Sequence, residues 1–181
     1  MTKEFEFELV FEIPNSEFDA FEISDAVFEA GFEDALVGTG QSGLLGVELE
    51  LSGDNAESVI LQAAQKLIKA LPQGTTLREV HPDLVSLADV AKKLNIKRQA
   101  LQKRRMPPPS LGGLYRIDEV YNALLEADQN AIRATRFNLG AALSWLNAGH
   151  AARHINAQLT MKVLDPKTIS KPKQPERANA A

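Results

Sequence analysis

Basic side chains are concentrated in one stretch of the chain. Eight Lys and Arg residues and no Asp or Glu lie between Lys92 and Arg116. Ammonium and guanidinium groups bind phosphate oxygens, whereas Arg and Gln can also form paired hydrogen bonds with base edges. The chemistry that these residue types indicate is contact with a polyanion. The candidate contact residues are Lys97, Arg98, Gln99, Gln102, Lys103, Arg104, Arg105 and Arg116.

The elements that must position these residues are two short crossed helices, which the sequence predicts over residues 87–94 and 98–104. Ser86 and Asp89 have the spacing of a capping box, which begins a helix. Asn95 lies at the expected turn, where a residue that tolerates positive φ is needed. Apolar residues fall where two crossed helices bury contacts, and this spacing is typical of a helix-turn-helix.

A wing is expected after the second helix. Three consecutive prolines from Pro107 end that helix, and Gly112-Gly113 can form a tight hairpin turn. Arg116 is then expected on the returning strand, in reach of phosphate or a minor groove. A further short helix is predicted over residues 118–127.

The stretch LVSLADVAKKLNIKRQALQKRRMPPPSLGGLYRIDEVYNALL resembles the MerR-like and AlpA/excisionase-like winged helix-turn-helix proteins. The resemblance covers about a quarter of the chain and implies binding to double-stranded DNA. The positions matching the family's DNA contacts are Arg98, Gln99 and Gln102 on the second helix, and Arg116 on the wing. Asn95 replaces the usual turn glycine, and the segment follows an acidic domain. The family's effector sensing is therefore not transferred to this chain.

Charge separates the chain into unlike parts. Residues 1–82 hold 4 basic and 16 acidic side chains, whereas residues 83–136 hold 10 basic and 6 acidic ones. This asymmetry indicates two modules with different partners, which the net charge of −4 conceals.

Residues 1–82 are predicted to form a ferredoxin-like βαββαβ domain, so the fold class is α+β. Alternation of apolar and acidic residues predicts strands over 4–13 and 44–51, and shorter strands are expected over 34–39 and 75–80. Ser16 and Asp19 resemble a capping box for a first helix with Phe18, Phe21, Val27 and Phe28 on its apolar side. Apolar residues at helical spacing predict a second helix over residues 55–71. His81-Pro82 is the expected domain boundary.

The first and third strands should be neighbours, which places their outward glutamates on one sheet face. These residues are Glu4, Glu6, Glu8, Glu12, Glu48 and Glu50. Such a face is either a solvated surface that keeps this domain away from DNA or a docking site. A docking site would take a basic protein partner or the chain's own tail, with Lys162, Lys167, Lys171, Lys173 and Arg177.

A C-terminal helical extension is predicted over residues 128–164. One helix should span 130–147 and stop at Gly149, and another is expected over 151–163. Trp145 lies in an apolar stripe with Leu139, Leu143 and Leu146, which either packs within the chain or joins a homodimer. Residues 165–181 are rich in Pro and Lys, and we expect them to be disordered.

Other chemistry finds little support. Cysteine is absent, which excludes disulfides and thiol catalysis and fits a cytoplasmic location. No signal peptide or membrane-spanning run is visible. The GTGQSG stretch from Gly38 precedes a predicted strand instead of a helix, so a hairpin turn is expected there. His150 and His154 lack a third metal ligand, and no nucleophile–base pair indicates an enzyme.

The sequence therefore predicts a non-enzymatic, sequence-specific DNA-binding protein, a transcriptional regulator of bacterial type, with no metal or cofactor. Its domains are 1–82, 83–127, 128–164 and the tail 165–181. The alternative is an adaptor or antitoxin-like protein whose αβ domain binds a protein or a small ligand.

Overall fold

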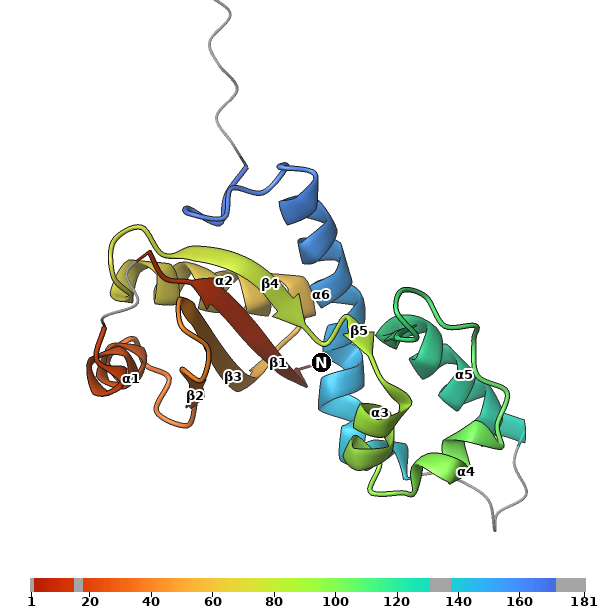
Figure 1. The fold of residues 1–181 in the computed structure, drawn as a ribbon. Coiled ribbons are helices and arrows are strands. Elements are labelled where there is room, and N and C mark those ends of the chain that lie inside the picture. The colour runs from red at the N-terminus through yellow and green to blue at the C-terminus, as the bar shows by residue number, and fades with distance from the viewer. Residues whose placement is uncertain (1, 15–17, 131–137, 172–181) are drawn as a thin grey trace, which may run out of the picture.

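A computed structural model describes residues 2–14, 18–130 and 138–171 of the chain (Figure 1). It is a mixed α+β structure, as expected. The strands are β1 (Lys3–Glu12), β2 (Leu36–Gly38), β3 (Leu44–Gly53), β4 (Thr76–His81), β5 (Leu84–Val85) and β6 (Tyr115–Arg116). The helices are α1 (Ala20–Glu29), α2 (Ala56–Ala70), α3 (Leu87–Lys93), α4 (Arg98–Gln102), α5 (Ile117–Asn130) and α6 (Leu143–Thr160), and a 3₁₀ turn over Leu139–Ala142 precedes α6.

The main sheet has the strand order β2-β3-β1-β4, and every neighbouring pair is antiparallel. β1 and β3 lie at its centre, as the sequence predicted. Their alternating residues divide between the two faces: Phe5, Phe7, Leu9 and Phe11 are buried, whereas the intervening positions are partly or fully exposed. A period of two with one apolar face produces this division.

Helices cover the buried face of this sheet. The predicted helix over 55–71 is confirmed as α2, and the Asn55 side chain caps it by accepting a hydrogen bond from the Ser58 backbone N–H. α6 packs beside α2 and against both β1 and β4 (Figure 1). We call this layer of β1–β4 with α1, α2 and the C-terminal half of α6 the sheet lobe.

The prediction for the first helix is wrong in two respects. α1 begins at Ala20 because Asp19 itself is the N-cap, accepting a hydrogen bond from the Phe21 N–H. Ser16 lies outside the described residues. The inward side of α1 is formed by Ile23 and Val27, whereas Phe21 and Phe28 face solvent. The prediction of the apolar side is therefore correct for Val27 and wrong for Phe21 and Phe28, and Phe18 is partly buried against the core.

α6 corrects the prediction of two C-terminal helices. It is one continuous helix through Gly149, which does not end it. A side chain at this position would overlap Ile117 Cγ2 of α5, so glycine permits the close approach of α5 and α6. The predicted helix over 130–147 falls partly outside the described residues, and only the 3₁₀ turn and the first residues of α6 lie in its C-terminal part.

A second core lies beside the sheet lobe and includes Val90, Leu94, Leu101 and Leu124 from α3, α4 and α5. Trp145 and Leu146 of α6 complete it and Leu139 packs against it, so most of the predicted stripe packs within the chain, whereas Leu143 is 40% exposed. We call β5, β6, α3, α4, α5 and the N-terminal half of α6 the helical lobe. The predicted extension 128–164 is thus not a separate unit, because α6 contributes to both cores.

The prediction of a disordered tail is wrong for residues 165–171. Asp165 and Ser170 form an isolated antiparallel bridge, and Ile169 is buried in the core of the sheet lobe. The Ile169 carbonyl accepts a hydrogen bond from Gln65 on α2, and the Pro166 carbonyl accepts one from the Leu77 N–H. One buried isoleucine and backbone pairing therefore fix a segment whose composition resembles a linker. Residues 172–181 lie outside the described part.

Candidate functional site

The helix pair α3–α4 forms the centre of the candidate site. Ser86 and Asp89 make the predicted capping box, and the Ser86 hydrogen bonds lower the pKa of the Asp89 carboxyl below its ordinary value. α3 ends at Lys93 with Leu94 as its C-cap, and Asn95 follows with a φ of 52°, which confirms the expected left-handed turn. The Asn95 N–H donates to Lys92 O and the Ile96 N–H donates to Ala91 O, the hydrogen-bond pattern of a Schellman cap.

Leu101 anchors one side of α4, because its side chain is completely buried in the core of the helical lobe. The opposite side of the helix consists of exposed polar residues, in agreement with the sequence prediction. Arg98 and Gln102 are four residues apart and share one helical face, since residues i and i+4 are neighbours on a helix. The exposed residues of α4 and its flanks are Lys97, Arg98, Gln99, Gln102, Lys103 and Arg105, whereas Arg104 is half-buried and makes contacts within the protein.

A shallow depression with a volume of about 320 Å³ adjoins this face, and Arg98, Gln102, Gly113 and Tyr115 are among the residues that line it. Gly112 and Gly113 both have positive φ, and the Ser110 N–H donates to the Leu114 carbonyl across their turn. The tight turn is therefore present beside α4, as expected for these glycines.

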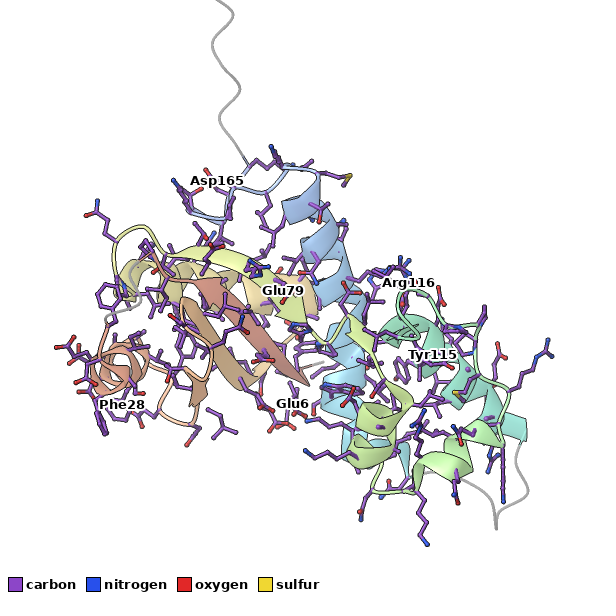
Figure 2. All side chains as sticks on the ribbon, in the orientation of Figure 1. Glu6, Phe28, Glu79, Tyr115, Arg116 and Asp165 are labelled. Carbon is purple, nitrogen blue, oxygen red and sulfur yellow. The ribbon has the colours of Figure 1, made fainter. Side chains whose placement is uncertain are left out.

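The strand after this turn differs from the predicted wing. β6 pairs with β5, which precedes α3, instead of with the segment before the glycines. Consecutive strand residues point to opposite faces, and it is Tyr115 that lines the depression beside α4. Arg116 is half-buried and does not line it; Figure 2 labels both side chains. Arg116 therefore lies on a strand, as predicted, but unlike Arg98, Gln102 and Arg104 it does not line the depression beside α4.

The acidic sheet face meets the helical lobe at α3. Two cross-strand pairs place carboxylates directly opposite each other, Glu6 with Glu50 and Glu8 with Glu48. Like charges in this arrangement repel. Lys93 of α3 forms an ion pair with Glu6, which Figure 2 labels at the junction, and lies 4.0 Å from Glu48 Oε1. The acidic face is therefore partly neutralised by the first helix of the pair, not left wholly to solvent.

Burial raises the pKa of the Glu48 carboxyl above its ordinary value of 4.5; a hydrogen bond with Glu6 raises it further, and Lys93 opposes the rise. The Lys93 ammonium group also lies 5.9 Å from the centroid of the Trp145 ring. Lys93 is thus bound by the sheet lobe and contributes no free charge to the surface around α4.

Two residues of α6 fix this helix against β4 and α5. The Asn156 side chain accepts a hydrogen bond from the Val80 N–H and donates one to the Val80 carbonyl, so both backbone groups of Val80 at the open edge of β4 are bonded. Asn156 also donates a hydrogen bond to Asp83 Oδ2. Arg153 pairs with Asp118 in the first turn of α5 at 2.6 Å. These residues and Lys93 were missed in the sequence, because only the tertiary structure brings their partners together.

The other candidate sites gain no support. The GTGQSG stretch connects β2 and β3 in an antiparallel hairpin, as expected, and no helix follows it. His154 lies 2.9 Å from Glu57 Oε2, and His150 is exposed. Within residues 2–14, 18–130 and 138–171, no group of three His, Asp or Glu side chains could hold a metal ion. In the same ranges, no helix is both long and apolar enough to span a bilayer.

Comparison with known proteins adds no further constraint. The chain matches no protein-family model, no curated protein and no solved structure.

Proposed function

We propose that this protein binds double-stranded DNA through α4, with α3 and α4 acting as a helix-turn-helix. The supporting observation is the face of α4, where basic and amide side chains are exposed while Leu101 anchors the helix in the core. No acidic residue interrupts the sequence between Lys92 and Arg116. Such a face suits a polyanion, whose phosphates bind cationic side chains and release counterions.

The side chains divide by chemistry into two roles. Arg98, Gln99 and Gln102 read base edges in the major groove, because Arg pairs with guanine and Gln with adenine through two hydrogen bonds. Lys97, Lys103 and Arg105 contact phosphates, which adds affinity without sequence information. Arg104 contributes to the same positive potential from a half-buried position. Arg116 is excluded from the base-reading set, because Tyr115 occupies the position beside α4.

The architecture supports a regulator with two modules. The strand order β2-β3-β1-β4 with antiparallel neighbours is that of a ferredoxin-like sheet, and we assign the sheet lobe to that architecture. We assign the helical lobe to the MerR-like and AlpA/excisionase-like type, with a glycine turn in place of a complete wing. The acidic sheet lobe repels phosphate, so DNA approaches from the side of α4.

The test is a titration of duplex DNA binding against salt concentration. We expect the logarithm of the affinity to fall steeply and linearly with the logarithm of salt concentration. Arg98→Ala should cost about 1–3 kcal/mol on a preferred site and relax specificity, whereas Lys103→Ala should lower the salt slope by about one on every sequence. Lys167→Ala is the matched control, because Lys167 is also an exposed lysine and lies in the segment after α6 that packs on the sheet lobe.

Two results would contradict the proposal. If wild type showed no salt-dependent binding to duplex DNA, an adaptor or antitoxin-like role for the sheet lobe would replace it. If Arg98→Ala and Lys103→Ala behaved like Lys167→Ala while wild type bound DNA, the interface would lie elsewhere on the protein.

A further inference from the structure

The outer face of α1 exposes large apolar side chains. Phe21 is 80% exposed and Phe28 is 55% exposed. They are seven residues apart, which places them on the same side of a helix. Asp25 lies between them, four residues after Phe21 and three before Phe28, so one stripe of α1 combines two aromatic rings with a carboxylate.

The stripe continues onto the edge of the sheet. Leu36 on β2 is 68% exposed, and β2 is an edge strand of the main sheet. Phe28, Leu36, Asp25 and Glu33 line one depression with a volume of 350 Å³. We call Phe21, Phe28 and Leu36 with this depression the α1 surface.

Three large apolar residues exposed on one surface indicate an interaction site, because apolar patches rimmed by polar residues mark places where partners bind. α1 itself packs mainly against α2, so its outer side has no partner among the described residues. In Figure 2, Phe28 points away from the protein at the end opposite α4. The α1 surface and the proposed DNA-binding helix can therefore be occupied at the same time.

Charge restricts what can bind here. The sequence has no Lys, Arg or His from Glu4 through Gln65, so every ionic side chain that α1 and its flanking loop supply is acidic. Nucleic acid and anionic lipid are repelled by such a surface. Symmetric pairing of two α1 helices would oppose like charges. The chain's own residues 171–181 are basic but contain no large apolar side chain to cover the phenylalanines.

We propose that the α1 surface docks a basic amphipathic helix of a partner protein. The apolar side of that helix covers Phe21, Phe28 and Leu36, and its Lys and Arg residues pair with Asp25 and Glu33 at the rim. Helix-in-groove recognition of this kind uses apolar anchors spaced one and two turns apart. Opposite charges at the rim select the partner and speed the encounter. The inference is independent of DNA binding.

The first experiment uses a synthetic peptide of about 18 residues, long enough to form a helix, with Leu on one face and Lys elsewhere. Binding is followed by amide chemical shifts of the full-length protein. We expect the shifts to concentrate on α1 and β2. A peptide with Ser in place of Leu, and another with Glu in place of Lys, should each bind at least about tenfold more weakly.

Substitutions separate this surface from the acidic sheet face. The double variant Phe21→Ser/Phe28→Ser should weaken the Leu–Lys peptide about tenfold or more, because both anchors are lost. Asp25→Lys should also weaken binding of the Leu–Lys peptide, because it replaces a negative charge at the rim with a positive one. The control Glu4→Gln/Glu50→Gln changes exposed carboxylates of the sheet and should leave the affinity unchanged. All four side chains replaced in the Phe and Glu pairs are exposed, so these variants should remain folded.

Three outcomes of the peptide titration would overturn the proposal: no binding, equal binding of the Ser peptide, or shifts centred on the outward face of β1 and β3. The second experiment places a photoreactive phenylalanine at position 28, with position 111, also an exposed large apolar residue, as the control beside the helical lobe. The segment cross-linked from position 28 should contain large apolar residues next to Lys or Arg, and Asp25→Lys should abolish its capture. An acidic segment, or no cross-link, would contradict the assignment.

Discussion

The sheet lobe and the helical lobe differ in the charge of their exposed faces and in the size of their cores. The sheet lobe has a large core with Phe5, Phe7 and Phe11 from one strand, and its exposed face is acidic. The helical lobe has a smaller core formed by short helices, and its exposed face around α4 is basic. One helix, α6, completes both cores. Surfaces of opposite charge therefore belong to a single structural unit, because α6 joins the two cores.

The largest expected effect tests whether α6 joins the lobes into one unit. Ile155 is completely buried in the core of the sheet lobe, so Ile155→Ala should lower the free energy of unfolding by about 2–5 kcal/mol. Trp145, the sole tryptophan, reports on the helical lobe. Its fluorescence and the circular dichroism of the whole chain should give one shared urea transition, shifted equally. Two separate transitions would show that the lobes unfold independently.

The next effect concerns the contact between α5 and α6. Alanine is a better helix former than glycine by about 1 kcal/mol, so propensity alone predicts that Gly149→Ala stabilises the protein. Its Cβ would overlap Ile117, and overpacking costs about 1–3 kcal/mol, so we expect a net loss of stability in urea denaturation. Adding Ile117→Ala should remove the overlap and make Gly149→Ala stabilising. A gain in the otherwise wild-type protein would show that α5 and α6 are less tightly packed at this position.

Helix caps offer a matched pair, one in each lobe. Ser86→Ala and Asn55→Ala should each cost about 1 kcal/mol at neutral pH. The pKa of Asp89 is lowered mainly by the Ser86 hydroxyl, so this contribution is present above the ordinary value of 3.8 and is lost as the pH falls through the lower folded value. The cost of Ser86→Ala should therefore shrink below pH 3.8, whereas that of Asn55→Ala should not. Equal pH dependence in urea denaturation would contradict this difference.

The smallest effect is the ion pair between the lobes. A double-mutant cycle of Lys93→Met and Glu6→Gln should give a coupling energy of about 1 kcal/mol that decreases as salt is added. The Arg78–Glu12 pair within the sheet lobe is the control: its side chains are 54% and 59% exposed, so its coupling should be closer to zero. Equal coupling in the two cycles would mean that Lys93 adds little to the attachment of the lobes.

Much of the fold could be predicted because local patterns determine it. Alternation predicted β1 and β3, the helical period predicted α2, and the capping box with Asn95 predicted α3 and its turn. The exposure of Arg98 and Gln102 on α4 was also predicted, because Leu101 and its neighbours define the buried side. Each of these features depends on residues within a few positions of one another.

Features that depend on distant partners could not be predicted. Glycine often ends a helix, so Gly149 was expected to end one. Instead it lies within α6, because Ile117 leaves no room there for a side chain. Arg116 was expected on a strand returning from the glycine turn, and it does lie on a strand, but β6 pairs with β5, and Tyr115 lines the depression beside α4. Phe21 and Phe28 were expected on the apolar side of the first helix with Val27, and nothing local shows that Ile23 takes their place beside Val27.

The sequence by itself determined the separation of charge, the strand and helix periods and the polar face of α4, because these are properties of residue type and short spacing. The tertiary structure alone decided that α6 belongs to both lobes, that Lys93 neutralises part of the acidic sheet face, and that α1 leaves two phenylalanines uncovered. The physical reason is that packing and ion pairing depend on which surfaces meet, and residues far apart in the chain form those surfaces.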